Sequence, residues 1–110
     1  MLFPKENAVK HKGYLRLVAS LPCIRCGIQG YSQAAHPPPT GKGRKEDDRK
    51  CFPLCCTRPD NPGCHFQFDQ YQLFPREKAV RKAEEWGRDT RLLIIRAGMW
   101  PEKLPRLLEH

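Results

Sequence analysis

Six cysteines lie in a chain of only 110 residues, and they constrain its fold more than any other feature. A chain of this length forms one domain that buries a modest share of its surface. Because only 39% of the residues are hydrophobic and 11 are prolines, we expect something besides apolar burial to stabilise the fold. Cysteines can do so as disulfides or as metal ligands.

The predicted compartment decides between these two uses of cysteine. Residues 1–7 lack the apolar region of a secretory signal, and no stretch approaches the roughly 18 apolar residues that span a membrane. We therefore expect a cytoplasmic protein whose thiols stay reduced and free to bind metal. Residues 108–110 are typical of a vector-encoded tag, so the predicted single domain spans residues 1–107.

A knuckle formed by Cys23 and Cys26 supplies two thiolates, and Gly27 after it can adopt the positive φ of a metal-binding turn. A structural zinc ion is held by four ligands, so a second pair must come from elsewhere in the chain. Four other cysteines compete for these places: Cys51, Cys55, Cys56 and Cys64.

We favour Cys55 and Cys64 as the second pair, because the Pro-Gly turn between them would fold the chain back toward the first knuckle. Cys56 is adjacent to Cys55 and points elsewhere in an extended chain, so only one of these two can bind comfortably. Whether Cys51 or Cys56 replaces Cys55 stays open. A disulfide and unliganded buried thiols are the alternatives to zinc.

Hydrophobic spacing and breaker residues predict an α+β fold, with a small ββα unit flanked by an N-terminal helix and a long C-terminal helix. The expected helices span 11–21, 64–73 and 76–97, and the expected strands span 29–36 and 51–55. Residues 37–50, between the strands, carry almost nothing apolar, so we predict a solvent-exposed loop there.

The long C-terminal helix carries a stripe at helical spacing that we expect to face the core. The stripe consists of Ala79, Ala83, Trp86, Thr90, Leu93 and Ala97. Gly98 suits the position just past the helix end. Gly87 costs a helix about 1 kcal/mol relative to alanine, so a break at Gly87 stays open.

The charge balance favours a polyanionic partner. Lys and Arg number 20 against 12 Asp and Glu, which gives a formal net charge of +8. Nucleic acid is the most common polyanion in a cell, so we expect DNA or RNA as the partner. Three cations in the predicted loop could contact phosphates, or could only keep the loop soluble: Lys42, Arg44 and Lys45.

Two histidines lie where a ββα unit would carry functional groups. His36 ends the first predicted strand, and His65 begins the next helix beside Cys64. The segments LPCIRCG, AAHPPPTGKGRKEDD, PLC and GCHFQFD follow one another in this order. This order resembles the HNH (ββα-metal) nucleases of phages and prophages, in particular the recombination-enhancement (Ref-like) and YbcO-like groups. The resemblance covers roughly residues 14–98.

The resemblance implies a metal-dependent DNA endonuclease that hydrolyses phosphodiester bonds in a bacterial or phage-infected cell. It implies that His36 is the general base, because unassisted water, with a pKa of about 15.7, is a poor nucleophile. His65 matches a ligand of the catalytic ion, Mg2+ or Mn2+. Asp48 matches the polar residue that orients the imidazole or helps to hold the metal, with Asp47 as its rival. Asp69 is a further candidate ligand.

The resemblance also implies an association with a recombinase–DNA filament. This chain departs from the family pattern at the position before the base. Many HNH proteins carry a metal-binding acid directly before the base, where this chain has Ala35, so we expect weak affinity for the catalytic metal. His65 could instead complete a Cys3His zinc site.

Two functions compete with the nuclease. One is a noncatalytic zinc-binding nucleic-acid module, and the other is a protein-interaction domain anchored by Trp86 and Trp100. The nuclease requires His36 and His65 to face each other closely enough to share one phosphate.

Overall fold

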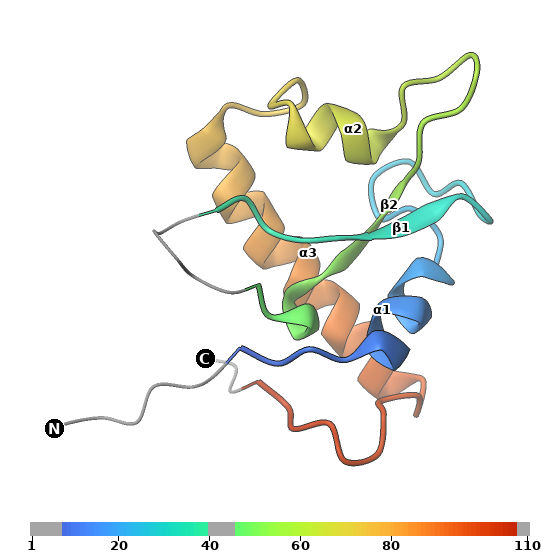
Figure 1. Cartoon of the computed structure of the whole chain (residues 1–110), viewed down its shortest axis with the longest axis vertical. Helices are drawn as coiled ribbons and strands as arrows, with labels where there is room; N and C mark the ends of the chain where they lie inside the picture. Colours follow the sequence, from blue (N-terminus) through green and yellow to red (C-terminus); the bar gives the residue numbers. More distant parts are fainter. Residues whose placement is uncertain (1–7, 40–45, 108–110) are drawn as a thin grey trace, which may run out of the picture.

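The computed structural model describes residues 8–39 and 46–107, which form a small α+β domain (Figure 1). Its elements are α1 (Lys12–Ala19), β1 (Ser32–Ala35), the 3-10 helix η1 (Asp48–Lys50), β2 (Phe52–Cys55), α2 (Cys64–Asp69) and α3 (Arg76–Arg96). The predicted order of helices and strands is confirmed. No helix within the described ranges combines the length and the apolarity needed to cross a membrane.

The two strands form an antiparallel hairpin that α3 crosses from behind, with α2 at one end (Figure 1). The register pairs Ser32 with Cys55 and Ala35 with Phe52. Phe52 is fully buried, and its ring lies 5.5 Å from that of Phe68 in α2 and 5.7 Å from that of Trp86 in α3, measured between centroids. Aromatic contacts from three elements therefore fix α2 and α3 against the hairpin.

A second apolar cluster joins α1 to the last turns of α3. Its buried members are Tyr14, Val18, Cys51, Ile94 and Leu104. Trp100 packs against Tyr14 with the rings tilted and 5.1 Å between their centroids, and its Nε1 donates to the carbonyl of Leu104. Trp86 is only 5% exposed and Trp100 is half-buried, so neither tryptophan is the exposed anchor that a protein-interaction domain would need.

The segment before β2 is not the solvent-exposed loop that we predicted. Asp48 and Arg49 are 3% and 2% exposed. Arg49 can be buried because its guanidinium donates to both carboxylate oxygens of Asp47, at 3.0 and 2.8 Å, and to the carbonyl of Pro105. Burial alone would raise the pKa of Asp47, but the contacts with Arg49 outweigh it and hold that pKa below its usual value.

Helix α3 runs without a break through Gly87, which lies against the backbone of η1. A Cβ built on Gly87 would lie 2.8 Å from the carbonyl oxygen of Lys50, so close packing requires glycine there. The predicted buried stripe is wrong at its end, because Leu93 is 54% exposed and Ile94 is buried instead. Ile94 belongs to the apolar cluster that joins α1 to α3, and the periodicity of the helix alone does not tell where α1 packs.

We predict that Gly87→Ala destabilises the protein by about 1–3 kcal/mol, because the new methyl group overpacks against Lys50. Intrinsic helix propensity has the opposite sign and favours alanine by about 1 kcal/mol. Urea unfolding measures the difference, with Glu84→Ala on the exposed face of α3 as the control that should change stability by no more than about 0.5 kcal/mol. A Gly87→Ala protein at least as stable as the unmodified protein would contradict the close packing.

Candidate functional site

Four cysteine thiols converge where three segments meet. The Sγ atoms of Cys23, Cys26, Cys55 and Cys64 all lie within 4.8 Å of one another. They come from the knuckle after α1, the end of β2 and the first residue of α2. The knuckle is tied to β2, because the Ile24 N–H donates to the carbonyl of Pro53 at 2.9 Å. The cluster could hold a metal ion such as zinc, and its members are the four cysteines that we favoured.

The other two cysteines have different surroundings. Cys51 is fully buried in the apolar cluster that joins α1 to α3, and Cys56 is outside the group of four thiols. Gly63 allows the chain to return to the cluster after Cys56. Its φ is 81°, and an added Cβ would lie 2.4 Å from the carbonyl oxygen of Cys56. A glycine is therefore needed to bring Cys64 beside Cys55.

The thiols are arranged to be stabilised by a cation. Burial raises the pKa of Cys23, but hydrogen bonds from the surrounding backbone outweigh it and bring that pKa to about 7. Burial raises the pKa of Cys64 to about 12. Thiols this close together would not all ionise unless a cation balanced their charge.

Hydrogen-bond donors surround the sulfur atoms. The Cys64 N–H donates to Sγ of Cys55 at 3.2 Å. The guanidinium groups of Arg25 and Arg58 lie 3.5 Å from Sγ of Cys64 and 3.7 Å from Sγ of Cys55. Four thiolates around a divalent ion would leave two negative charges, which these two arginines could balance.

His65 is adjacent to this cluster in sequence but points away from it. Its Nδ1 lies 2.7 Å from Oε1 of Gln33 on β1, and its Nε2 lies 3.3 Å from Oδ2 of Asp69, one helical turn along α2. An amide oxygen only accepts, so Nδ1 carries the proton and Nε2 is the nitrogen available for a metal. Cys64 fills the fourth place in the thiol cluster, which leaves no role there for His65.

His36, directly after β1, lies between two carboxylates. Its Nε2 is 3.0 Å from Oδ1 of Asp48, and its Nδ1 is 3.1 Å from Oε2 of Glu46. The other oxygen of Asp48 accepts from the backbone N–H of His11 at 2.7 Å. Asp48 is thus buried and held on both oxygens, whereas the side chain of Glu46 is 57% exposed.

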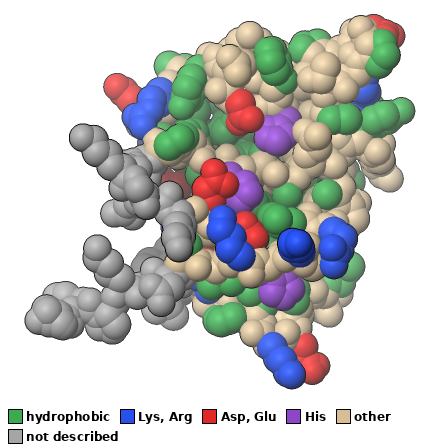
Figure 2. Space-filling model, in the orientation of Figure 1, with side chains coloured by type: hydrophobic (Ala, Val, Ile, Leu, Met, Phe, Trp, Pro, Cys, Tyr) green, Lys and Arg blue, Asp and Glu red, His purple; other side chains and the backbone are tan. Residues whose placement is uncertain are grey.

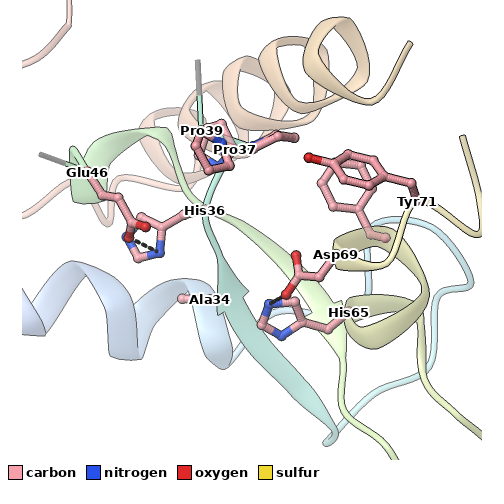
Figure 3. Close-up of a pocket in the computed structure, with 10 residues that line it drawn as sticks. Ala34, His36, Pro37, Pro39, Glu46, His65, Asp69 and Tyr71 are labelled. Atoms are coloured by element: carbon pink, nitrogen blue, oxygen red, sulfur yellow. Dashed lines mark ion pairs between the residues drawn. The ribbon is translucent and has the colours of Figure 1, made fainter. Parts of the chain in front are cut away.

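His36 and His65 line the same pocket, which has a volume of about 370 Å³ (Figure 3). The full lining consists of Ala34, His36, Pro37, Pro38, Pro39, Glu46, His65, Phe68, Asp69 and Tyr71. Figure 2 shows histidine and acidic side chains next to one another on this face. Both histidines thus lie at one pocket and not on opposite sides of the molecule; that they share one phosphate stays a prediction.

The acidic groups of the pocket favour a cation. The pKa of Asp69 is raised by burial and by the charge of Glu46, and His65 opposes this rise. The separation of 3.3 Å between Nε2 of His65 and Oδ2 of Asp69 fits two ligands of one divalent ion with bonds of about 2.1 Å. His36, Asp48 and Cys51 form a second group whose ligand atoms lie close enough to hold a metal ion. Burial strongly raises the pKa of Cys51, however, and keeps this thiol neutral.

Several residues that contact the predicted site residues were not predicted from the sequence. Gln33 and Glu46 have no pattern of their own, although Glu46 belongs to an acidic run. His11 caps α1 through its Nδ1 and holds Asp48 through its backbone N–H, and no sequence pattern indicated either contact. Asp47 is bound to Arg49 and faces neither imidazole in any contact of the described residues. The predicted phosphate contacts lie outside the described residues: Lys42, Arg44 and Lys45.

Tyr71 occupies a position that normally favours glycine. Helix α2 ends at Asp69, earlier than predicted, because the Gln72 N–H bonds to the carbonyl of Gln67 and the Tyr71 N–H to that of Phe68. These two bonds form a Schellman motif, whose residue in left-handed conformation is here Tyr71 with a φ of 56°. A tyrosine at this place is costly for the backbone, and its side chain lines the pocket.

A scan against protein-family models and searches of curated proteins and of solved structures find no match to this chain.

We predict that Tyr71→Gly is more stable than Tyr71→Ala by about 1 kcal/mol, because only glycine adopts this conformation without strain. Thermal or urea unfolding of the two variants isolates the backbone term, since both lack the ring. At the exposed helical position Glu84 the order should reverse, with glycine less stable than alanine by about 1 kcal/mol. The same order at both positions would contradict the left-handed backbone of Tyr71.

Proposed function

We propose that the protein is a metal-dependent DNA endonuclease of the HNH type, which hydrolyses phosphodiester bonds. One observation carries the proposal. Two imidazoles from different elements, each oriented by its own polar partners, line one pocket beside a cluster of cysteines. A noncatalytic docking module would not require this arrangement.

His36 has the surroundings of a general base. With Nε2 held by the buried Asp48, Nδ1 would accept the proton from water, and the exposed Glu46 side chain that now faces Nδ1 would have to move aside. The imidazolium that results lies between two carboxylates, Asp48 behind it and Glu46 beside it. Asp48 orients and stabilises the ring, as the acid of a catalytic triad does. We assign Asp48 this role rather than that of a metal ligand, because both its oxygens are already hydrogen-bonded.

His65 and Asp69 would hold the catalytic ion, with Mg2+ or Mn2+ as the candidates. When bound, such an ion would stabilise negative charge on the scissile phosphate and on the leaving oxygen. Gln33 fixes the tautomer of His65 that leaves Nε2 basic. Ala35 is fully buried, so an acid at that position would lie in the core. Asp69 and Glu46 provide the carboxylates from other elements.

DNA as the substrate is supported by the net charge of +8. The acidic pocket itself would repel a phosphate without a cation, so binding must rely on the ion and on surrounding basic residues. Lys42, Arg44 and Lys45 remain the predicted phosphate contacts. The association with a recombinase–DNA filament remains an expectation from the resemblance.

A structural zinc ion in the cysteine cluster is the second part of the proposal. Tetrahedral sites with four thiolates are typical of structural zinc. The four thiols belong to three separate segments of a small domain, so the ion would supply much of the folding free energy.

We predict that the protein binds one equivalent of zinc per chain. Cys64→Ser should lose this zinc and should no longer show a cooperative unfolding transition. Metal analysis and circular dichroism measure both properties. Cys56→Ser is the matched control, because Cys56 is close to the cluster in sequence but is not part of it, and this variant should keep its zinc and its fold. Equal zinc loss in both variants, or none in either, would contradict the assigned ligands.

We predict that the protein nicks supercoiled plasmid with Mg2+ or Mn2+, and that His36→Ala lowers the rate by roughly 100-fold or more. His65→Ala should reduce the rate similarly and raise the metal concentration required. Glu84→Ala, outside the pocket on α3, should nick at the unmodified rate. All variants should retain zinc and fold. DNA binding with steep salt dependence but no nicking under either metal would instead favour the noncatalytic module.

A further inference from the structure

The pocket has a second half that the proposed hydrolysis does not use. His36, Glu46, His65 and Asp69 form its polar side. The remaining wall is apolar and aromatic, and consists of Ala34, Pro37, Pro38, Pro39, Phe68 and Tyr71. The volume of about 370 Å³ falls in the range of small-molecule sites, roughly 300 to 1,000 Å³. A phosphate and its ion therefore leave room for a further group.

The proline side of this wall is fixed. Three consecutive prolines have restricted φ angles and offer no backbone N–H, so a ligand meets a stiff surface without donors. Arg76, the first residue of α3, donates from Nη2 to the carbonyl of Pro39 at 2.6 Å. This bond attaches the end of the proline segment to the long helix. A flat apolar group would fit such a surface by contact alone.

Tyr71 stands across the pocket from Pro37 and Pro39, with its hydroxyl end directed into the space between them (Figure 3). Tyr71 is 39% exposed, and its hydroxyl makes no hydrogen bond with the described residues. Its backbone is held by the Schellman bonds in a conformation that glycine would adopt more easily. The ring is thus presented from a fixed point to the pocket that the two imidazoles also line.

We infer that this half of the pocket binds the base of an unpaired nucleotide next to the scissile phosphate, with Tyr71 as the residue that positions it. The inference rests on the proposed nuclease function and specifies its substrate. A base within a duplex is stacked and paired and cannot enter a pocket, whereas an unpaired base can lie against an aromatic ring. The preferred DNA is therefore single-stranded, or unpaired at the cut.

Fluorescence anisotropy of a labelled single strand and of the matching fully paired duplex tests this preference on the zinc-loaded full chain. Every protein in this assay also carries His36→Ala, so that the DNA is not cut during the measurement. We expect tighter binding of the single strand than of the duplex. Tyr71→Ala and Tyr71→Gly should each weaken binding of the single strand by roughly 5- to 150-fold and leave duplex binding unchanged, and Tyr71→Phe should retain most of the affinity. The glycine variant removes the ring without straining the backbone, so its loss of binding cannot come from misfolding.

Tyr31→Ala is the matched control, because Tyr31 is similarly exposed, at 47%, and is not part of the pocket lining. It should not change the preference for single strands. Equal binding of both probes, or a preference that persists in Tyr71→Ala and Tyr71→Gly, would overturn the inference. Plasmid nicking with His36 intact tests the proposed function separately. If the protein nicks plasmid but the Tyr71 variants keep their affinity for single strands, the base-binding inference is refuted and the nuclease function is not.

Discussion

The thiol cluster is the contact on which the rest of the site depends. Helix α2 has only six residues, and a helix that short is not stable without tertiary contacts. Cys64 begins this helix and joins it to the knuckle and to the end of β2. His65 is the next residue, so the contact that anchors the helix also sets the direction of its imidazole. Phe68, one turn further, packs the same helix on Phe52 of the hairpin that leads to His36.

A buried charge network supports the other half of the site. Asp48 is 3% exposed, and its two oxygens accept from the ring of His36 and the backbone of His11. Its neighbour Arg49 is buried with Asp47 as its partner, and Arg91 of α3 donates to the Arg49 carbonyl. Removing one partner of such a network costs far more than removing an exposed ion pair. The position of His36 therefore depends on α1 and α3 as well as on its own strand.

The sequence predicted what local signals determine. Spacing and breaker residues sufficed for the order of elements. The turn containing Gly63 favoured Cys55 and Cys64, but it left open whether Cys51 or Cys56 takes the place of Cys55. Burial of Asp48 and Arg49 could not be predicted, because their partners His11 and Pro105 lie far away in the chain. The burial of Ile94 in place of Leu93 follows from where α1 packs. Glu46 and Tyr71 reach the pocket through tertiary packing, which no local pattern records.

In the proposed mechanism, the two imidazoles act on one phosphate. A crystal structure of the His36→Ala protein with Mn2+ and a DNA oligonucleotide, with the ion located by its anomalous scattering, tests this arrangement. We expect manganese bound to His65 and Asp69, and a phosphate of the DNA between that ion and position 36. Manganese at another place, or DNA bound on a face that does not include the pocket, would contradict it.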